Sequence, residues 1–284
     1  MRNKELGVLD FRRIEKLVEL WLDEDIGHGD LTANLMVGAN ATGRFCLAAR
    51  EPLVVAGLPV AQRVFQVCGR GITVTPEVDD GATVDAGATL AYVEGRARPI
   101  LTAERTALNV LQHLCGIATE TSRYVAAVEG TGAEIVDTRK TTPGLRMLEK
   151  YAVMCGGGRN HRLGLDGGIM LKDNHIAVAG SIRDAVEGAR KSAPLLTKIE
   201  VECDTLDQVR DALTANADVI MLDNMDNETM REAVALIAGR AVVECSGGVR
   251  LETVRSKAET GVDVISVGRI TQAAPAVDIG LDEA

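Results

Sequence analysis

The pattern of apolar and polar positions changes twice along the chain. Residues 10–25 repeat apolar side chains at helical spacing behind Asp10, an N-cap type of residue, which predicts an amphipathic helix. Residues 43–95 carry short alternating runs separated by Gly and Asp, which predict a small, mostly antiparallel sheet with helical partners. A further helix is expected over residues 102–117, where leucines form an apolar stripe.

From about residue 130 the chain alternates between short apolar runs and amphipathic stretches. Apolar strands separated by helices form a parallel sheet covered by those helices, and a repeat of roughly 20–25 residues is that of a βα barrel unit. Six strands are expected, over residues 134–137, 168–172, 198–202, 219–223, 241–245 and 263–267. Helices are expected between the later ones, over residues 182–191, 206–215, 228–238 and 251–259.

These patterns predict an α/β protein with two domains. An N-terminal α+β sandwich domain is expected over residues 1–115, with residues 276–284 packing back on it. An irregular, TIM-like parallel α/β barrel is expected over residues 116–275. Since only six strands are clear and residues 118–128 fit no pattern, the barrel is expected to have fewer than eight regular strands.

The composition argues against several classes of function. Aromatic residues are only 2% of the 284, too few for a base-stacking platform, and the formal net charge of −10 opposes binding to nucleic acid or to an anionic membrane. The segment Met1–Arg13 lacks the apolar core of a signal peptide, and no apolar run is long enough to span a bilayer. The six cysteines show neither CxxC pairs nor zinc-ligand spacing. We therefore expect a cytoplasmic protein.

Charge is unevenly distributed along the chain. Between Asp137 and His175 there are 7 Lys and Arg against 4 Asp and Glu, so this stretch is positive although the whole chain is strongly negative. A local basic cluster in an acidic protein indicates a site for a small anion, while chance clustering on a solvated face is an equally open interpretation.

The expected strands end in polar or ionisable residues, at the end where a βα barrel carries its active site. The strand ends read DTRK (137–140), KDNH (172–175), EVE (200–202), DN (223–224), SGG (246–248) and SVGR (266–269). Glycines in the last two allow the backbone to approach an anion, and the last strands of such barrels commonly hold a phosphate. Together these ends predict an anion site next to a phosphate site.

Four segments in the basic stretch are distinctive: DTRKTTPGLR (137–146), EKYAV (149–153), GGGRNHR (156–162) and LKDNHI (171–176). In these segments the sequence closely resembles the nicotinate-nucleotide pyrophosphorylase family, the quinolinate phosphoribosyltransferases. Further matching segments follow the family's order over nearly the whole chain, at residues 23–32, 103–109, 200–202, 222–224, 246–248 and 271–275. The resemblance implies transfer of the phosphoribosyl group of phosphoribosyl pyrophosphate to quinolinate with decarboxylation, giving nicotinate mononucleotide, CO₂ and pyrophosphate.

The resemblance also implies roles for individual residues. The receptor for quinolinate, a dicarboxylate, is a cluster of cations made of Arg139, His161, Arg162 and Lys172, joined by Arg105 from the N-terminal domain of a neighbouring subunit. The residues facing phosphoribosyl pyrophosphate, with catalytic roles, are Lys140, Glu202 and Asp223. The 5′-phosphate is expected on the backbone of Ser246, Gly247, Gly248, Val267, Gly268 and Arg269. A homodimer, or a larger assembly of such dimers, is implied as well.

The chemistry agrees with these roles. Carboxylates beside a ribosyl centre can stabilise the positive charge that develops as pyrophosphate leaves, and they can bind ribose hydroxyls or Mg²⁺. Mg²⁺ is the implied cofactor, with Glu202 and Asp223 as candidate ligands and much of the coordination coming from substrate and water. After transfer, the quaternary ring nitrogen stabilises the carbanion that CO₂ leaves behind. The protein is then expected to position the substrates and neutralise their charges, without forming a covalent intermediate.

Three other functions stay open on the sequence alone. A paralogue of the molybdenum-associated branch would share the fold and act on another substrate, although that branch lacks the intact TTPGLR, EKYAV and KDNH segments. A Schiff-base aldolase barrel would use Lys172 as a nucleophile, although the charged residues around it suit an anion better. A non-catalytic metabolite-binding protein would not need Lys140, Glu202 and Asp223 together.

Several other basic residues have no assigned chemistry. Arg146, Lys150 and Arg159 fit surface or dimer contacts as well as a site. His113 is expected to be a packing residue, and His175 either orients the end of the strand before it or is structural.

Overall fold

The structure is a computed structural model that describes residues 9–284, so the first part of Met1–Arg13 lies outside the described residues. The chain divides into two compact units. The first contains Met1–Ser122, Met147–Gly157 and Ala274–Ala284, and the second contains Arg123–Arg146 and Gly158–Ala273. No helix within residues 9–284 is both long and apolar enough to cross a membrane.

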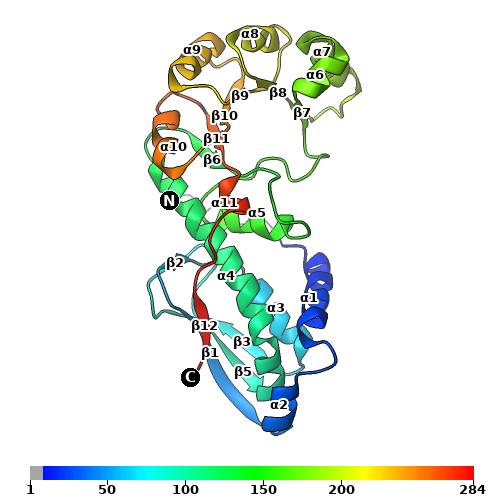
Figure 1. Ribbon diagram of the computed structural model, residues 1–284, viewed down its shortest axis with the longest axis vertical. Helices are drawn as coiled ribbons and strands as arrows, with labels where there is room; N and C mark the ends of the chain where they lie inside the picture. Colours follow the sequence, from blue (N-terminus) through cyan, green and yellow to red (C-terminus); the bar gives the residue numbers. More distant parts are fainter. Residues whose placement is uncertain (1–8) are drawn as a thin grey trace. The chain divides into compact units, whose positions relative to one another are not determined.

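The first unit is built on an antiparallel sheet in the order β12-β1-β5-β3. Its strands are β1 (Thr42–Ala49), β3 (Thr73–Pro76), β5 (Thr89–Arg96) and β12 (Ile279–Glu283), and a small second sheet pairs β2 (Leu53–Val54) with β4 (Thr83–Val84). The prediction of a small antiparallel sheet over residues 43–95 is confirmed. The C-terminal residues join this sheet because β12 pairs with β1 from Ile279 opposite Ala49 to Glu283 opposite Phe45 (Figure 1).

Helices cover this sheet domain. They are α1 (Phe11–Ile26), α2 (Leu31–Met36), α3 (Leu58–Cys68), α4 (Ala97–Ala127) and α5 (Arg146–Cys155). The first helix begins as predicted, since the Asp10 carboxylate accepts a hydrogen bond from the Arg12 backbone N–H at 3.1 Å. Its buried face is formed by Ile14, Val18 and Leu22.

The long helix α4 differs from the expectation. It runs on for ten residues beyond the helix predicted over 102–117, and the division between the two units falls inside it, after Ser122. The continuation buries Ala118, Thr121 and Tyr124, which follow one another at helical spacing. Because two of these three residues are small or polar, their spacing gives no apolar stripe, and the sequence pattern misses this part of the helix.

The second unit holds six parallel strands in the order β6-β11-β10-β9-β8-β7. The strands are β6 (Glu134–Val136), β7 (Ile169–Leu171), β8 (Ile199–Cys203), β9 (Val219–Asp223), β10 (Val242–Ser246) and β11 (Val264–Ser266). All six predicted strands are confirmed with slightly shifted ends. The helices that alternate with them are α6 (Asp173–Ala179), α7 (Ile182–Ser192), α8 (Leu206–Thr214), α9 (Asn227–Ile237), α10 (Leu251–Ala258) and α11 (Arg269–Gln272) (Figure 1).

Acidic residues before two strands fix the register of the sheet. The Asp218 carboxylate accepts the backbone N–H of Ile199 at 2.9 Å, and the Asp263 carboxylate accepts that of Val243 at 2.7 Å. Each aspartate therefore links the start of the strand that follows it to the start of the neighbouring strand in the sheet. With register fixed at the amino ends, the side chains at the carboxyl ends come level with one another.

The free edge of β6 explains why the barrel is irregular. A single β-bridge joins Val136 to Arg159, with hydrogen bonds from Arg159 N–H to Ile135 O at 2.9 Å and from Asp137 N–H to Arg159 O at 3.2 Å. The segment 158–162 therefore lies where a further strand would stand in a regular barrel.

Two glycines test the packing of this fold. A Cβ on Gly116, in α4, would lie 2.1 Å from the carbonyl oxygen of Pro275, whereas a Cβ on Gly188, in α7, would meet nothing within 4 Å. Gly116→Ala is expected to lower the free energy of unfolding by about 1–3 kcal/mol through overpacking. Gly188→Ala is expected to raise it by about 0.5–1 kcal/mol through helix propensity. Urea unfolding followed by circular dichroism measures both, and equal effects of the two substitutions would contradict this packing.

Candidate active site

The carboxyl ends of the strands in the second unit surround a cavity of about 560 Å³. Its lining contains most of the residues selected from the sequence, namely Arg139, Lys140, His161, Arg162, Lys172, Glu202, Asp223, Ser246, Gly247 and Gly248. An adjoining cavity of about 220 Å³ shares Lys140 and residues 246–248 with the first and adds Gly268 and Arg269. Residues from six different strand ends are thus brought together.

Two selected residues do not line these cavities. Arg105 lies on α4 in the first unit and is absent from both linings. Val267 is only 1% exposed, and its backbone N–H donates to the Val136 carbonyl at 2.9 Å. The expectation that the Val267 amide binds phosphate is therefore wrong, because pairing with β6 already uses that donor.

The guanidinium group of Arg162 is held in place by the loop that follows it. Its Nη1 donates to the Gly168 carbonyl at 2.9 Å, and its Nη2 lies 3.6 Å from the Met170 sulfur. Burial and the nearby positive charge of Arg139 lower the pKa of Arg162. Two arginines brought this close repel each other, so the pair gains stability when an anion lies between them.

Lys172 pairs with a carboxylate on the neighbouring strand. Its ammonium forms an ion pair with Glu202, which is 16% exposed, and its backbone N–H donates to Nδ1 of His175 at 3.0 Å. His175 therefore holds the backbone at the end of β7. The ion pair places one cation and one anion side by side on the cavity wall.

The glycine loop after β10 depends on close approach. Gly247 has φ +90°, and a Cβ there would lie 2.1 Å from Oδ1 of Asn224. Asn224 in turn donates from Nδ2 to the Asp223 carboxylate at 2.6 Å. Gly268 similarly leaves space for Lys140, whose Cδ would lie 2.8 Å from an added Cβ. Both glycines thus allow a polar side chain to lie against backbone.

Family models match both parts of the chain. Residues 117–282 match the quinolinate phosphoribosyl transferase C-terminal domain, and residues 30–115 match the N-terminal domain. The chain belongs to the quinolinate phosphoribosyltransferase family. This excludes the aldolase and the non-catalytic binding protein as family assignments.

Named relatives and solved structures cover almost the entire chain. The nicotinate-nucleotide pyrophosphorylase [carboxylating] of Mycobacterium leprae is 45% identical over 98% of this chain and 99% of its own length. A probable enzyme of the same name from Bacillus subtilis is 42% identical over 95% and 93%. The crystal structure of NadC from Streptococcus pyogenes is 40% identical, with a TM-score of 0.94 over 98% of this chain and 99% of that one.

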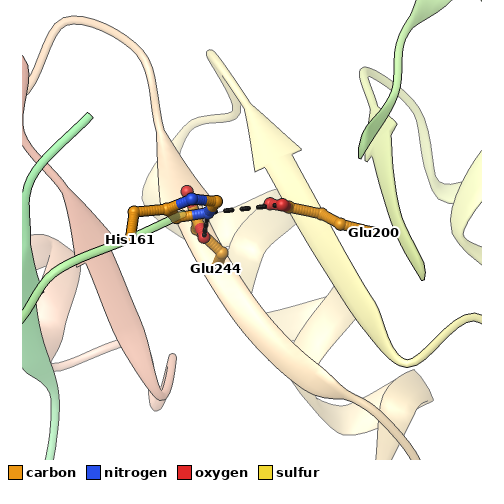
Figure 2. Close-up of side chains that lie close together, drawn as sticks. All are labelled: His161, Glu200 and Glu244. Atoms are coloured by element: carbon orange, nitrogen blue, oxygen red, sulfur yellow. Dashed lines mark ion pairs between the residues drawn. The ribbon is translucent and has the colours of Figure 1, made fainter. Parts of the chain in front are cut away.

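Inside the barrel, His161 pairs with two glutamates that were not selected as site residues from the sequence. His161 Nε2 lies 3.3 Å from Oε2 of Glu200 on β8 and 3.2 Å from Oε2 of Glu244 on β10, and Figure 2 shows the imidazole between the two carboxylates. Hydrogen bonds to these carboxylates raise the pKa of His161, whereas the Arg162 N–H directed at Nδ1 opposes a second proton on the ring. Burial raises the pKa of Glu200, an effect that His161 opposes. We call these three residues the buried triad.

The triad changes the role expected for His161 in this member of the family. The backbone N–H of Arg162 donates to Nδ1 of His161 at 2.8 Å, so both ring nitrogens already have partners in the protein. His161 lines the cavity, but it presents no uncommitted nitrogen to quinolinate. The signal for the triad was a glutamate in the middle of each of two largely apolar strands, Glu200 in IEVEC, which also contains Glu202, and Glu244 in VVECS. Other lining residues that the sequence analysis did not select are Asp137, Thr138, Met170, Met221, Asn224 and Ser266.

The basic residues to which the sequence analysis assigned no chemistry line neither the 560 Å³ cavity nor the 220 Å³ cavity. Arg146 donates to Oγ1 of Thr141 at 3.0 Å, and Arg159 pairs with Glu134 at 2.8 Å. Lys150 is buried in the first unit. His113, also in the first unit, pairs through Nε2 with the buried carboxylate of Glu149 at 2.9 Å.

The glycine loop yields a test of the phosphate site. Gly247→Ala is expected to weaken binding of inorganic phosphate about 10-fold, because the new Cβ displaces Asn224 and strains the loop. Gly248→Ala is the matched control, since its φ is +60° but a Cβ there would meet nothing within 4 Å. Titration calorimetry should show the larger loss for Gly247→Ala. Equal affinities of the two variants would rule out close packing at Gly247 as the determinant.

Proposed function

We propose that the two adjoining cavities are the active site at which this chain converts quinolinate and phosphoribosyl pyrophosphate to nicotinate mononucleotide, CO₂ and pyrophosphate. The supporting observation is that a cation cluster and a glycine loop adjoin at one end of the strands. The family assignment and the carboxylating relatives support the same reaction, which places the chain in pyridine nucleotide synthesis.

Quinolinate binds to the cations on one side of the larger cavity. Its two carboxylates suit the guanidinium groups of Arg139 and Arg162, which can each make two parallel hydrogen bonds, with the ammonium of Lys172 beside them. The Lys172–Glu202 ion pair favours this role over Schiff-base chemistry, because an ammonium paired with a carboxylate is not a nucleophile.

Phosphoribosyl pyrophosphate extends from the larger cavity into the smaller one. The 5′-phosphate lies against residues 246–248 and the backbone at Gly268 and Arg269, with Lys140 reaching across from β6. Asp223 and Glu202 lie on the wall between the phosphate loops and the cation cluster, where positive charge develops on the ribose as pyrophosphate leaves. Asp223 and Glu202 therefore act on the ribose through their position and their negative charge.

Mg²⁺ fits this arrangement as a partner of the leaving pyrophosphate. When bound, it neutralises the charge that develops on the leaving group. Glu202 is already ion-paired with Lys172, so Asp223 is the cavity carboxylate that would hold the ion, with most ligands coming from pyrophosphate and water. The alternative ligand set of Glu202 and Asp223 together would require breaking the ion pair.

We further propose that the active unit is a cytoplasmic homodimer, or an assembly of such dimers. The six cysteines are all free, as in a reducing compartment. The resemblance to the family carries the expectation that Arg105, in the first unit, completes the site of a neighbouring subunit.

The cation cluster makes a direct prediction for catalysis. Arg139→Ala should lower kcat/KM for quinolinate at least about 100-fold, because a charged, bidentate contact is lost and Arg162 is left to bind the dicarboxylate. Arg183→Ala, on the exposed face of α7, is the control and should behave as wild type. Steady-state assays of mononucleotide and pyrophosphate measure both, and an unchanged kcat/KM in Arg139→Ala would remove the cation cluster from the mechanism.

A mixing experiment tests the proposed role of Arg105. Arg105→Ala and Arg139→Ala proteins are each expected to be nearly inactive, but after mixing and exchange of subunits about a quarter of wild-type activity should return. Random pairing makes half the dimers hybrids, and one of the two sites in each hybrid then has both arginines. No recovery, with subunit exchange verified by native mass spectrometry, would mean that Arg105 acts within its own chain or not at all.

A further inference from the structure

The buried triad separates two cavities inside the second unit. Glu244 is two residues before Ser246 on β10, so it shares the face of Ser246 and lies roughly 6.6 Å deeper along the strand. A third cavity of about 320 Å³ lies beyond it, at the amino ends of the strands, bounded by Ile169, Lys198 and Val242. Glu244 and His161 border both this amino-end cavity and the substrate cavity, whereas Glu200 borders only the amino-end cavity.

The triad requires a proton beyond the one on the imidazole. Because Nδ1 of His161 accepts the Arg162 N–H, the ring proton is on Nε2, between the two carboxylates. Glu200 and Glu244 are 5% and 2% exposed, and Oε1 of each has no hydrogen-bond partner within the described residues. Two ionised carboxylates buried so closely would repel each other strongly. One proton shared between them removes the second charge and allows a hydrogen bond from one carboxyl group to the other.

A metal ion fits the triad less well than a proton. The three side chains are close enough together to surround a cation. However, a histidine that binds a metal through Nε2 carries its proton on Nδ1 and donates it to an acceptor. Here Nδ1 accepts a hydrogen bond from the Arg162 backbone, which requires Nδ1 to be unprotonated.

We propose that Glu244 is the acid that protonates the ring carbon from which CO₂ departs, and that Glu200 resupplies its proton from the amino-end cavity. This rests on the proposed function. When the bond between ring carbon 2 and its carboxylate breaks, CO₂ leaves and the electron pair remains on carbon 2. The Glu244 carboxyl group transfers its proton to this electron pair as the bond breaks, so the rate of CO₂ release depends on the acid. Both carboxylates are then without their shared proton, so Glu200 takes a proton from water in the amino-end cavity and passes it to Glu244.

The position of the triad explains why such a route is useful. Phosphoribosylated quinolinate and pyrophosphate fill the mouth of the substrate cavity before CO₂ leaves, and bound substrates of this kind exclude water from a closed site. A carboxyl group reached from the opposite end of the barrel delivers a proton without opening the site. His161 is a positioning residue in this scheme, since its Nε2–H holds the two carboxyl groups together.

The test separates the two chemical steps of one turnover. Glu244→Gln keeps the shape of the side chain and removes the acid, and Glu200→Gln does the same for the resupply. Glu232→Gln, on the exposed face of α9, is the matched control. Quinolinate labelled in its 2-carboxyl group is mixed with phosphoribosyl pyrophosphate and Mg²⁺, and labelled CO₂ and pyrophosphate are followed in the same single turnover.

The expected result is that CO₂ release lags behind pyrophosphate release. In Glu244→Gln, pyrophosphate should appear at close to the wild-type rate while CO₂ release slows about 100-fold, the usual contribution of a positioned acid. Glu200→Gln should release CO₂ without a lag in the first turnover and with a lag in the turnovers that follow, when the proton has to be resupplied. Glu244→Asp, which keeps a carboxyl group, should restore much of the rate. In wild type and Glu232→Gln the two products should appear together.

Other outcomes have definite meanings. CO₂ released at the wild-type rate by Glu244→Gln would overturn the proposal. Equal slowing of CO₂ and pyrophosphate with a raised KM for quinolinate would also overturn it, since the triad would then only support the binding site. Should Glu244→Gln fail to fold, Glu200→Gln followed over several turnovers decides by the same ratio of products, and the absence of a CO₂ lag there would overturn the proposal. If wild type releases neither product, the proposed function itself fails.

Discussion

The catalytic end of the second unit depends on one buried carboxylate, Asp137. This residue is fully buried at the end of β6, where it accepts the His161 backbone N–H at 2.9 Å and the Asn160 side-chain amide at 2.6 Å. Together with the bridge between Val136 and Arg159, it fixes segment 158–162 along the edge of the sheet. A loop is thereby made as rigid as a strand, and both the histidine of the triad and the arginine after it take their positions from backbone hydrogen bonds.

Much of the fold could be predicted because parallel strands buried on both faces have an unmistakable apolar pattern. The polar residues that follow these strands located the site, since ionisable residues directly after a buried apolar strand have few other functions. The pattern could not predict the full length of α4, where Ala118 and Thr121 carry the buried face. It also gave no indication of α5 (Arg146–Cys155), nor that the segment Met147–Gly157 belongs to the first unit although it follows β6 in the chain.

Within the site, the sequence predicted residues that lie in a recognisable motif, but it did not predict which residues of different motifs contact one another. Lys172 pairs with Glu202, thirty positions away, and not with the adjacent Asp173. The resemblance drew attention to Glu202 through the register of the EVE segment, one residue before the end of β8. Glu200 was seen only as part of the EVE segment, and Glu244 was not noticed, because a glutamate inside a strand is indistinguishable from a solvent-facing one until the strands are arranged around a common interior. Their proximity is a property of the fold alone.

The central claim is that one continuous site holds quinolinate on the cation cluster and the 5′-phosphate on the glycine loop. A crystal structure with quinolinate and an unreactive analogue of phosphoribosyl pyrophosphate tests this most directly. The account predicts both carboxylates of quinolinate within hydrogen-bonding distance of Arg139 and Arg162, and the 5′-phosphate on the backbone at residues 246–248. Quinolinate bound without contact to either arginine, or a phosphate away from that loop, would contradict it.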